Sequence, residues 1–250
     1  MKYGIYQASR QGGRPYNEDR LFHAQSEAAL VLVVADGMGG HAHGEVASQL
    51  TVDTLGRMFD KEARPLLADP SGFLLDAIYA AHDAINAHAL EADMPEPPRT
   101  TCVACIVQED MATWAHVGDS RLYHFGRDRF RMHTRDHSLV QDLIDRGIFS
   151  AEEAQQKAGR NYLYNAIGGT MLPDIEMSDA TPLHEGDLLL LCSDGFWDTL
   201  APEEMLAELK ARPLQQAVPR LMDLAEQRGG AHCDNLSVLV LRYGPEPAVG

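Results

Sequence analysis

Acidic side chains stand at the ends of apolar segments that are far apart in this chain. The valine-rich run Ala29–Ala35 is followed at once by Asp36 and by glycines at positions 37, 39 and 40. Such a run is typical of a buried strand, and glycine allows backbone conformations that a side chain would forbid. A carboxylate at the end of a buried strand is costly unless its charge is compensated. Asp36 therefore belongs either to a ligand-binding loop or to an ordinary turn, since Asp-Gly is a common turn pair.

The same arrangement recurs elsewhere in the chain. Further acidic positions lie next to apolar, strand-like runs at Asn17-Glu18-Asp19, Gly118-Asp119-Ser120, Ser193-Asp194-Gly195 and Asp234-Asn235. If these carboxylates converge, their mutual repulsion requires metal cations. If they do not converge, each is a turn or a helix cap. The recurrence favours a common site.

The elements that would position these residues follow from the spacing of apolar residues. Strands are expected at Tyr3–Ser9, Arg20–Ala24, Leu30–Ala35, Thr101–Gln108, Met111–Val117, Arg121–Phe125, Arg129–His133, Ile175–Ala180, Leu188–Cys192 and Leu236–Tyr243. Helices are expected from Gly44 onward and at Phe73–Glu91, Pro202–Lys210 and Leu214–Arg228. Short turns between strands imply antiparallel pairing. Paired helices and strand meanders indicate an α+β fold with two packed sheets flanked by helices.

One segment differs in character from the rest of the chain. Residues 136 to about 158 are polar and have the pattern of one or two short amphipathic helices, with Leu139, Leu143 and Ile144 on one side. The sequence from Ser150 to Glu153 is a helix-start signal. We expect a small helical flap here, within residues 136–168.

Length and charge limit the classes of function. The 250 residues suit a single domain, expected at 1–244, followed by a tail at 245–250. The net charge of −16 argues against nucleic acid or a membrane surface as a partner. It does not exclude a phosphorylated substrate, because bound cations can reverse the local field. We find no signal peptide and no run of membrane-span length, so a cytoplasmic monomer is expected.

The four cysteines are expected to be structural. Cys102 and Cys105 are three positions apart in a predicted strand, so their side chains face opposite sides and cannot share a metal or a disulfide. Cys192 and Cys233 each lie close to one of the acidic positions. We interpret both as small buried residues and not as nucleophiles.

Five segments in order carry a resemblance to a known family. They are R-P-Y-N-E-D at 14–19, A-D-G-M-G-G-H at 35–41, V-G-D-S-R at 117–121, S-D-G-F-W-D at 193–198 and C-D-N-L-S at 233–237. Together they resemble the metal-dependent serine/threonine protein phosphatases of type 2C, the PPM family, in their compact bacterial form. The resemblance implies a central β-sandwich of two antiparallel sheets with a helix pair on each outer face. It also implies hydrolysis of phosphoserine and phosphothreonine by a metal-activated water, without a phosphoenzyme.

The resemblance also implies a set of metal ligands. By this resemblance Asp36 bridges two ions, Asp194 and Asp234 bind the first, Glu18 and the carbonyl of Gly37 bind the second, and Asp119 shares a third with Asp194. Oxygen ligands of this kind favour Mg²⁺ or Mn²⁺, as two or three ions.

The remaining roles implied by the resemblance concern phosphate and protons. Arg14 matches the phosphate-binding arginine, and Asp19 resembles an acceptor that orients metal-bound water. His41 matches a histidine that protonates the leaving alkoxide. The alternatives are a surface arginine, a loop histidine, or a transition-metal pair of His41 with His43. Asp198 either borders the third-metal position or is a helix-start acid.

Further expectations concern Trp197 and the flap. Trp197 is expected to pack in the core. Tyr162, Asn165 and Gly168-Gly169 lie where the family's flap rejoins the core. The sequence there reads A-G-R-N at 158–161, where relatives often carry His-Pro before the arginine. Substrate selection by the flap is therefore the least transferable part of the resemblance.

The implied substrate is a phosphorylated protein, and the implied partner is a cognate serine/threonine kinase. Two other classes stay open at this point. One is an inactive, phosphatase-like scaffold, against which the intact set of Glu18, Asp36, Asp194 and Asp234 weighs. The other is a metal hydrolase of small phosphoesters or nucleotides, although no Walker-type glycine loop is present.

Overall fold

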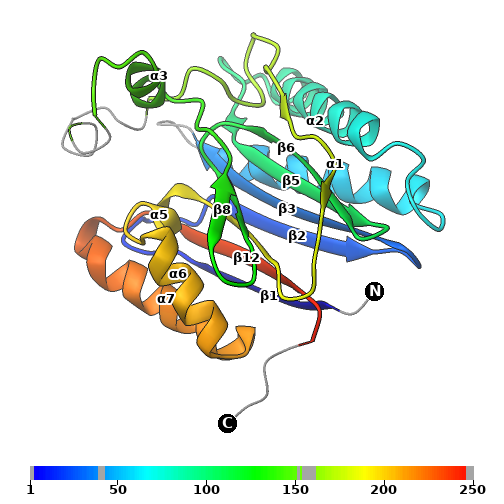
Figure 1. The fold of residues 1–250 in the computed structure, drawn as a ribbon. Coiled ribbons are helices and arrows are strands. Elements are labelled where there is room, and N and C mark those ends of the chain that lie inside the picture. Colours follow the sequence, from blue (N-terminus) through cyan, green and yellow to red (C-terminus); the bar gives the residue numbers. More distant parts are fainter. Residues whose placement is uncertain (1–2, 39–42, 151–152, 154–161, 246–250) are drawn as a thin grey trace.

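The chain folds into four layers, with helices on the two outer faces and two sheets between them (Figure 1). The computed structural model describes residues 3–38, 43–150, 153 and 162–245. The predicted β-sandwich flanked by helix pairs is confirmed.

Both sheets are antiparallel. The first has the order β1 (Tyr3–Arg10), β12 (Leu236–Tyr243), β11 (Leu188–Cys192), β7 (Arg121–Phe125) and β8 (Phe130–His133). The second has the order β10 (Thr181–Pro182), β6 (Met111–Val117), β5 (Cys102–Gln108), β3 (Ala29–Met38) and β2 (Asp19–Gln25). Two short strands add to this second sheet: β4 (Arg99–Thr100) pairs with β3, and β9 (Glu176–Met177) pairs with β6.

The short strands are where the sequence-based expectation is wrong. The apolar pattern predicts a single strand at Ile175–Ala180, but the structure has only the two-residue β9 within this range, and the two-residue β10 follows it. Two residues carry no measurable periodicity, so hydrophobic patterning cannot separate them.

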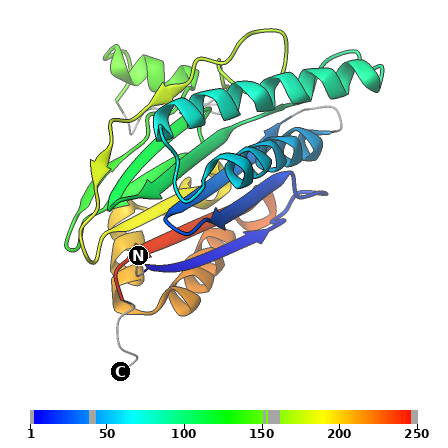
Figure 2. The same ribbon diagram turned by 90° about the vertical axis from the view of Figure 1, so that its right-hand side faces the viewer.

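Each sheet is covered by a helix pair. Helices α1 (Gly44–Glu62) and α2 (Pro70–Glu91) pack on the β2–β3–β5–β6 face, and α6 (Pro202–Ala211) and α7 (Leu214–Gly229) pack on the other sheet (Figure 2). The Asp69 side chain accepts a hydrogen bond from the Ser71 amide at 3.1 Å, which caps the start of α2. Along the described ranges, none of the helices is both long enough and apolar enough to span a membrane.

Strand β3 explains why its sequence is apolar at every position. Its residues alternate between two apolar cores: Val31 and Val33 face α1 and α2, whereas Leu30 and Leu32 face the first sheet. Both faces of the strand are therefore buried. The same alternation places Cys102 in the outer core and Cys105 in the core between the sheets, as predicted from strand geometry.

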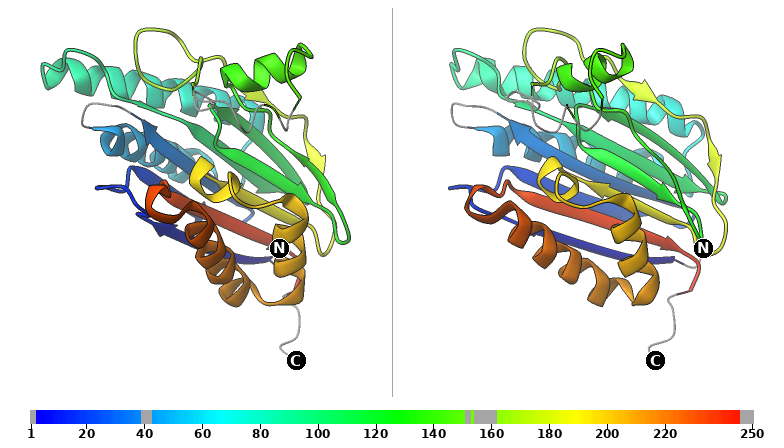
Figure 3. Two further views of the ribbon diagram at one scale, coloured as in Figure 1. Left: turned by 90° about the vertical axis from the view of Figure 1, so that its left-hand side faces the viewer. Right: turned by 60° about the vertical axis from the view of Figure 1, so that its left-hand side comes forward.

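In the part of the flap that the structure describes, the short helix α3 (Leu139–Asp145) lies at one end of the sandwich (Figure 3). Ser138 caps it by accepting a hydrogen bond from the Gln141 amide at 3.2 Å, and no residue of α3 is buried. Reciprocal bonds between Ser150 and Glu153, at 2.8 and 3.2 Å, form the predicted helix-start signal. Residues 151–152 and 154–161 lie outside the described part of the chain.

Candidate active site

The register of β2 against β3 brings two of the predicted site residues together. Asp19 and Asp36 are direct partners across this antiparallel pair. The Asp36 amide donates to the Thr101 hydroxyl at 3.0 Å, which fixes the end of the strand. A Cβ at Gly37 would lie 2.1 Å from the Gly44 carbonyl oxygen, so only glycine allows this close approach to the start of α1.

The other sheet delivers two more carboxylates to the same place. Asp194 lies in the first turn of α5 (Asp194–Trp197), directly after β11, and Asp234 lies just before β12. Ser193 joins the sheets, because its hydroxyl donates to Asp19 Oδ2 at 2.7 Å and accepts from the Ser237 amide at 3.0 Å. The two sheets are thus tied together directly beneath the acidic residues.

Asn235 holds the N-terminal loop against this end of the sandwich. Its side-chain oxygen accepts from the Glu18 amide at 2.8 Å, and its Nδ2 donates to the carbonyls of Gln11 and Tyr16 at 2.8 and 2.9 Å. The loop also carries Arg14, whose guanidinium lies 2.5 Å from Asp234 Oδ2. Two site residues from the start of the chain are therefore positioned by residues near its end.

A cavity of about 540 Å³ lies where these segments meet. Its lining includes every predicted metal ligand together with the predicted phosphate-binding arginine: Glu18, Asp36, Gly37, Asp119, Asp194, Asp234 and Arg14. Asp19 is buried behind Asp36 and does not line the cavity. We call the five acidic residues in this lining the carboxylate site.

The electrostatics of the site are those of crowded, buried acids. Burial, followed by repulsion from Asp19 and Asp194, raises the pKa of Asp36 well above its usual range. Burial and then repulsion from Asp119 do the same for the pKa of Asp194. Burial also raises the pKa of Asp19 to about 6 and, with repulsion from Asp136, that of Asp119 to about 7. For Glu18, burial and then the charge of Glu45 raise the pKa.

This donor set fits hard divalent cations. Its ligand atoms are carboxylate oxygens and one backbone carbonyl, which Mg²⁺ and Mn²⁺ prefer over softer donors. Burial, and then repulsion from neighbouring acids, raises the pKa values of Asp36 and Asp194 even with the Arg14 guanidinium beside them. Bound cations would offset the repulsion between the carboxylates and allow all of them to ionise at neutral pH.

The backbone carbonyl of Asp119 is held by Trp197, which is in turn contacted by Arg121. Trp197 Nε1 donates to the Asp119 carbonyl at 2.9 Å, and the Arg121 guanidinium lies 3.4 Å above the Trp197 ring. Arg121 in turn pairs with both Asp136 oxygens at 2.7 Å. Trp197 packs partly on the helix-side core, as expected, and also supports the site. An adjoining cavity of about 630 Å³ shares Asp119 and Asp194, and Asp198 lines it.

The expectations for His41 and His43 have different outcomes. His41 lies outside the described residues. His43 is the N-cap of α1 with a left-handed φ of 105°, and its Nδ1 lies 3.9 Å from Glu45. Within the described part of the chain, His43 belongs to no group of side chains that could hold a metal.

Sequence reasoning missed the uncharged supports of the site. Thr101, Ser193 and Asn235 orient Asp36, Asp19 and Glu18 respectively, yet none carries a charge that would mark it. The available signal was their position, since each adjoins a buried strand where a polar side chain needs a partner.

Comparison with known proteins gives a consistent picture. A family model described as protein phosphatase 2C matches residues 7–232. The serine/threonine protein phosphatase PstP of Mycobacterium tuberculosis is 36% identical over 233 residues, which cover 91% of this chain and 42% of that protein. The chain therefore spans about two fifths of that relative's length. The serine/threonine phosphatase stp of Listeria innocua is 34% identical over 91% of this chain and 90% of its own length.

A solved structure extends the similarity to the fold. The catalytic domain of the serine threonine protein phosphatase PstP, in complex with two manganese ions, has a TM-score of 0.83 and 31% sequence identity. The match covers 97% of this chain and 99% of that one. Its bound manganese agrees in kind with the oxygen donors that converge here.

Proposed function

This chain belongs to the protein phosphatase 2C family, and we propose that it hydrolyses phosphoserine and phosphothreonine in proteins, using Mn²⁺ or Mg²⁺. One observation carries the proposal. Acidic residues from five separate segments, together with Arg14, line a single cavity at the end of the sandwich. Carboxylates repel one another and repel phosphate, so this arrangement suits phosphate only when cations are bound.

The residues of the carboxylate site would hold the cations. We assign Asp36 as the bridging ligand, Asp194 and Asp234 to one ion, Glu18 and the Gly37 carbonyl to the second, and Asp119 with Asp194 to a third. When bound, such ions activate water and neutralise the charge on the transferring phosphoryl group.

Arg14 and Asp19 have roles that do not require them to be ligands. The Arg14 guanidinium is half exposed at the mouth of the site, where its fork can bind two phosphoryl oxygens. Asp19 is fixed by the Ser193 hydroxyl behind Asp36, so it can accept a hydrogen bond from water held in front of it. We further propose that His41 donates the proton to the leaving alkoxide.

Cysteine chemistry does not fit this site. Burial raises the pKa of Cys102 to about 12 and also raises the pKa values of Cys105, Cys192 and Cys233. A thiolate nucleophile is therefore disfavoured, which supports direct attack by water without a phosphoenzyme. All four cysteines are unpaired, as in a reducing compartment, and this supports a cytoplasmic location.

The wider assignments rest on the same family. We propose that residues 1–244 form one catalytic domain, since a continuous apolar core joins the two sheets. We also propose that this domain acts as a monomer. The substrates would be phosphoproteins, and the partner would be a serine/threonine kinase whose phosphorylation this enzyme reverses.

Phosphate release from a phosphothreonine peptide tests the function. We expect turnover with Mn²⁺ that excess EDTA abolishes and that the Asp36→Asn variant lacks. A phenyl phosphate ester should be measured in parallel. Faster turnover of the small ester at equal concentration would indicate a small-phosphoester hydrolase, and metal binding without turnover would indicate a scaffold.

A further inference from the structure

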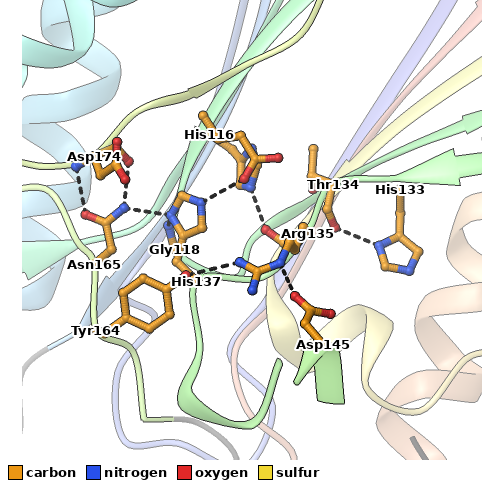
Figure 4. Close-up of polar contacts among 11 residues, drawn as sticks. His116, Gly118, His133, Thr134, Arg135, His137, Asp145, Tyr164, Asn165 and Asp174 are labelled. Carbon is orange, nitrogen blue, oxygen red and sulfur yellow. Dashed lines mark hydrogen bonds and ion pairs between the residues drawn. The ribbon is translucent and has the colours of Figure 1, made fainter. Parts of the chain in front are cut away.

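A second cluster of titratable side chains lies next to the Gly118–Asp119 loop (Figure 4). It consists of His116 on β6, His137 just before α3, and Glu176 on β9, with potential ligand atoms all within 4.8 Å of one another. We call these three residues the histidine cluster. Both histidines are buried, and Glu176 is exposed. Imidazoles with a carboxylate are donors that transition metals use, so a metal is the first hypothesis to consider.

The hydrogen bonds of His137 fix where its proton lies. Its Nδ1 faces two donors, the Gly118 amide at 3.3 Å and Asn165 Nδ2 at 2.7 Å (Figure 4). The Asn165 amide cannot be reversed without loss, because its oxygen accepts from the Asp174 amide at 3.1 Å and its nitrogen donates to the Asp174 carbonyl at 2.6 Å. Nδ1 is therefore the unprotonated nitrogen, and Nε2 carries the proton toward Glu176 Oε2 at 3.4 Å.

This tautomer is the wrong one for a metal ligand. A histidine that binds a metal through one nitrogen normally donates the other N–H to an acceptor, whereas the second nitrogen of His137 faces two donors. His116 Nε2 lies 2.7 Å from the Arg135 carbonyl, which also makes it a donor. Hydrogen bonds to other protein groups therefore already occupy His116 Nε2 and both ring nitrogens of His137, and the function of the cluster must be sought in what it holds.

What His137 holds is the backbone of Gly118. The His137 amide donates to the Gly118 carbonyl at 3.0 Å, and His137 Nδ1 accepts from the Gly118 amide. Both backbone polar groups of Gly118 are therefore bound by one histidine. Gly118 has a φ of +99°, and a Cβ there would lie 2.6 Å from Thr101 Cγ2. The next residue is Asp119 of the carboxylate site.

The neighbour of His137 supports Asp119 from the other side. Asp136 binds Arg121, Arg121 stacks on Trp197, and Trp197 donates to the Asp119 carbonyl. His137 also accepts from the Tyr164 amide at 3.2 Å through its carbonyl, and Tyr164 follows the cavity-lining Leu163. Asp119 is thus fixed through the segment that begins the flap and the segment that ends it.

We propose that His137 is a positioning residue for the phosphatase reaction. Asn165 fixes the tautomer in which Nε2 carries the proton, and in this tautomer Nδ1 holds the Gly118 amide so that Asp119 faces the metal site. This inference rests on the proposed function for its consequence in catalysis, but not for the tautomer itself. The inference predicts that the Mn²⁺ response of turnover depends on the hydrogen-bond acceptor at the Nδ1 position and not on the nitrogen at the Nε2 position.

Two substitutions at the same position separate these atoms. His137→Asn keeps an acceptor near the Nδ1 position, whereas His137→Gln moves the polar group to the Nε2 position. We expect His137→Gln to raise the Mn²⁺ concentration for half-maximal phosphopeptide turnover about tenfold, because one buried hydrogen bond is lost. The KM for the peptide should be unchanged. His137→Asn should restore most of the wild-type Mn²⁺ response. Equal responses of the two variants would overturn the proposal.

A third variant tests the tautomer by spectroscopy. Asn165→Asp replaces the donor facing Nδ1 by a carboxylate, which should protonate Nδ1 and release the Gly118 amide. Long-range ¹H–¹⁵N correlation spectra of the Mg²⁺-loaded protein should show His137 as Nε2–H in the wild type and with a protonated Nδ1 in Asn165→Asp. The His137 signals are assigned by their loss in His137→Asn. A protonated Nδ1 in the wild type would overturn the proposal and restore the metal hypothesis.

His124→Asn is the matched control. His124 is also buried beside a carboxylate, with Nε2 3.3 Å from Asp187, but it lies outside the carboxylate site and the histidine cluster. Its substitution should therefore leave the Mn²⁺ response unchanged. If His137→Gln does not fold, Asn165→Asp and the wild-type spectrum still decide the outcome. If the wild type has no phosphopeptide turnover, the proposed function fails, and Mn²⁺ binding by calorimetry still tests the positioning of Asp119.

Discussion

The carboxylate site and the histidine cluster are both groups of metal-type side chains, and they lie close to one another. They differ in how their polar atoms are satisfied. In the carboxylate site, acids from five segments line one cavity, and burial with mutual repulsion raises the pKa values of Asp36 and Asp194. In the histidine cluster, the ring nitrogens of His137 meet two donors on one side and a carboxylate on the other.

The difference shows that residue types alone do not define a metal site. The first group has an excess of negative charge, and a cation would balance it. In the second group, His116 Nε2 and both ring nitrogens of His137 already act as hydrogen-bond donors or acceptors, so these three atoms are satisfied without a cation. The balance of charge and hydrogen bonds, more than the nearness of the side chains, distinguishes the two.

The largest effect is expected from Asp36→Asn. Removing the proposed bridging carboxylate should lower turnover by about a thousandfold or more, since both cations lose a shared ligand. The same change removes one of several repelling buried charges, so the metal-free protein should melt at an equal or higher temperature. Phosphopeptide kinetics and thermal melting in EDTA measure the two effects. Near-normal turnover at saturating Mn²⁺ would remove Asp36 from the site.

A smaller effect is expected from Arg14→Lys. Lysine keeps the positive charge but loses the fork that can bind two phosphoryl oxygens. We expect kcat/KM for a phosphopeptide to fall about 10- to 100-fold, the range for losing a charged hydrogen bond. The Mn²⁺ response should change little, which separates phosphate binding from metal binding. An unchanged kcat/KM would mean that Arg14 only neutralises Asp234.

A third prediction concerns the stability of the metal-free protein as pH changes. Burial raises the pKa of Asp19 to about 6 and that of Asp119 to about 7, from 3.8. Between the unfolded and folded pKa values the folded state holds more protons than the unfolded state, so the free energy of unfolding falls as pH rises from about 4 to about 7. A difference of one in the pKa of a group between the folded and unfolded states corresponds to about 1.4 kcal/mol.

Melting temperatures in EDTA should thus decrease from pH 5 to pH 8, and the increase produced by Mg²⁺ should grow over the same range. Asp36→Asn should flatten this profile, because it removes one of the interacting charges. A metal-free stability that rises with pH would contradict the crowding of acids described above.

The smallest effect is expected from Glu176→Gln. Glu176 is exposed and accepts a long bond from His137 at 3.4 Å, so Mn²⁺-dependent turnover should change by less than about twofold. Zinc binding, measured by calorimetry with the carboxylate site saturated by Mg²⁺, should be the same in this variant and the wild type. Loss of a zinc-binding step would show that the histidine cluster is a metal site after all.

Much of the carboxylate site could be predicted from the sequence. Its acids lie at the ends of long, strongly apolar strands, and such strands have recognisable boundaries. The apolar runs alone therefore predict that Asp36 and Asp194 stand at strand ends, where the structure places them. The two-residue strands β9 and β10 give no such signal, and the pattern predicts a single strand in their place.

The histidine cluster could not be predicted in this way. His116 and His137 belong to segments with no shared motif, and Glu176 lies on one of the two-residue strands. The role of His137 depends on which nitrogen is protonated, and Asn165 and Asp174 determine this through contacts that no spacing rule describes. For the same reason the sequence marks Asn235 only as the neighbour of an acid.

The hold of Asn235 on the N-terminal loop has a consequence for how the protein is made. Strand β1 lies at the edge of its sheet and pairs with β12, and Glu18 is held by Asn235. During translation, Arg14 and Glu18 leave the ribosome before residues 233–243 and lack these partners until that later segment has been synthesised. The nascent chain therefore has no complete carboxylate site until nearly all of residues 1–244 have been synthesised.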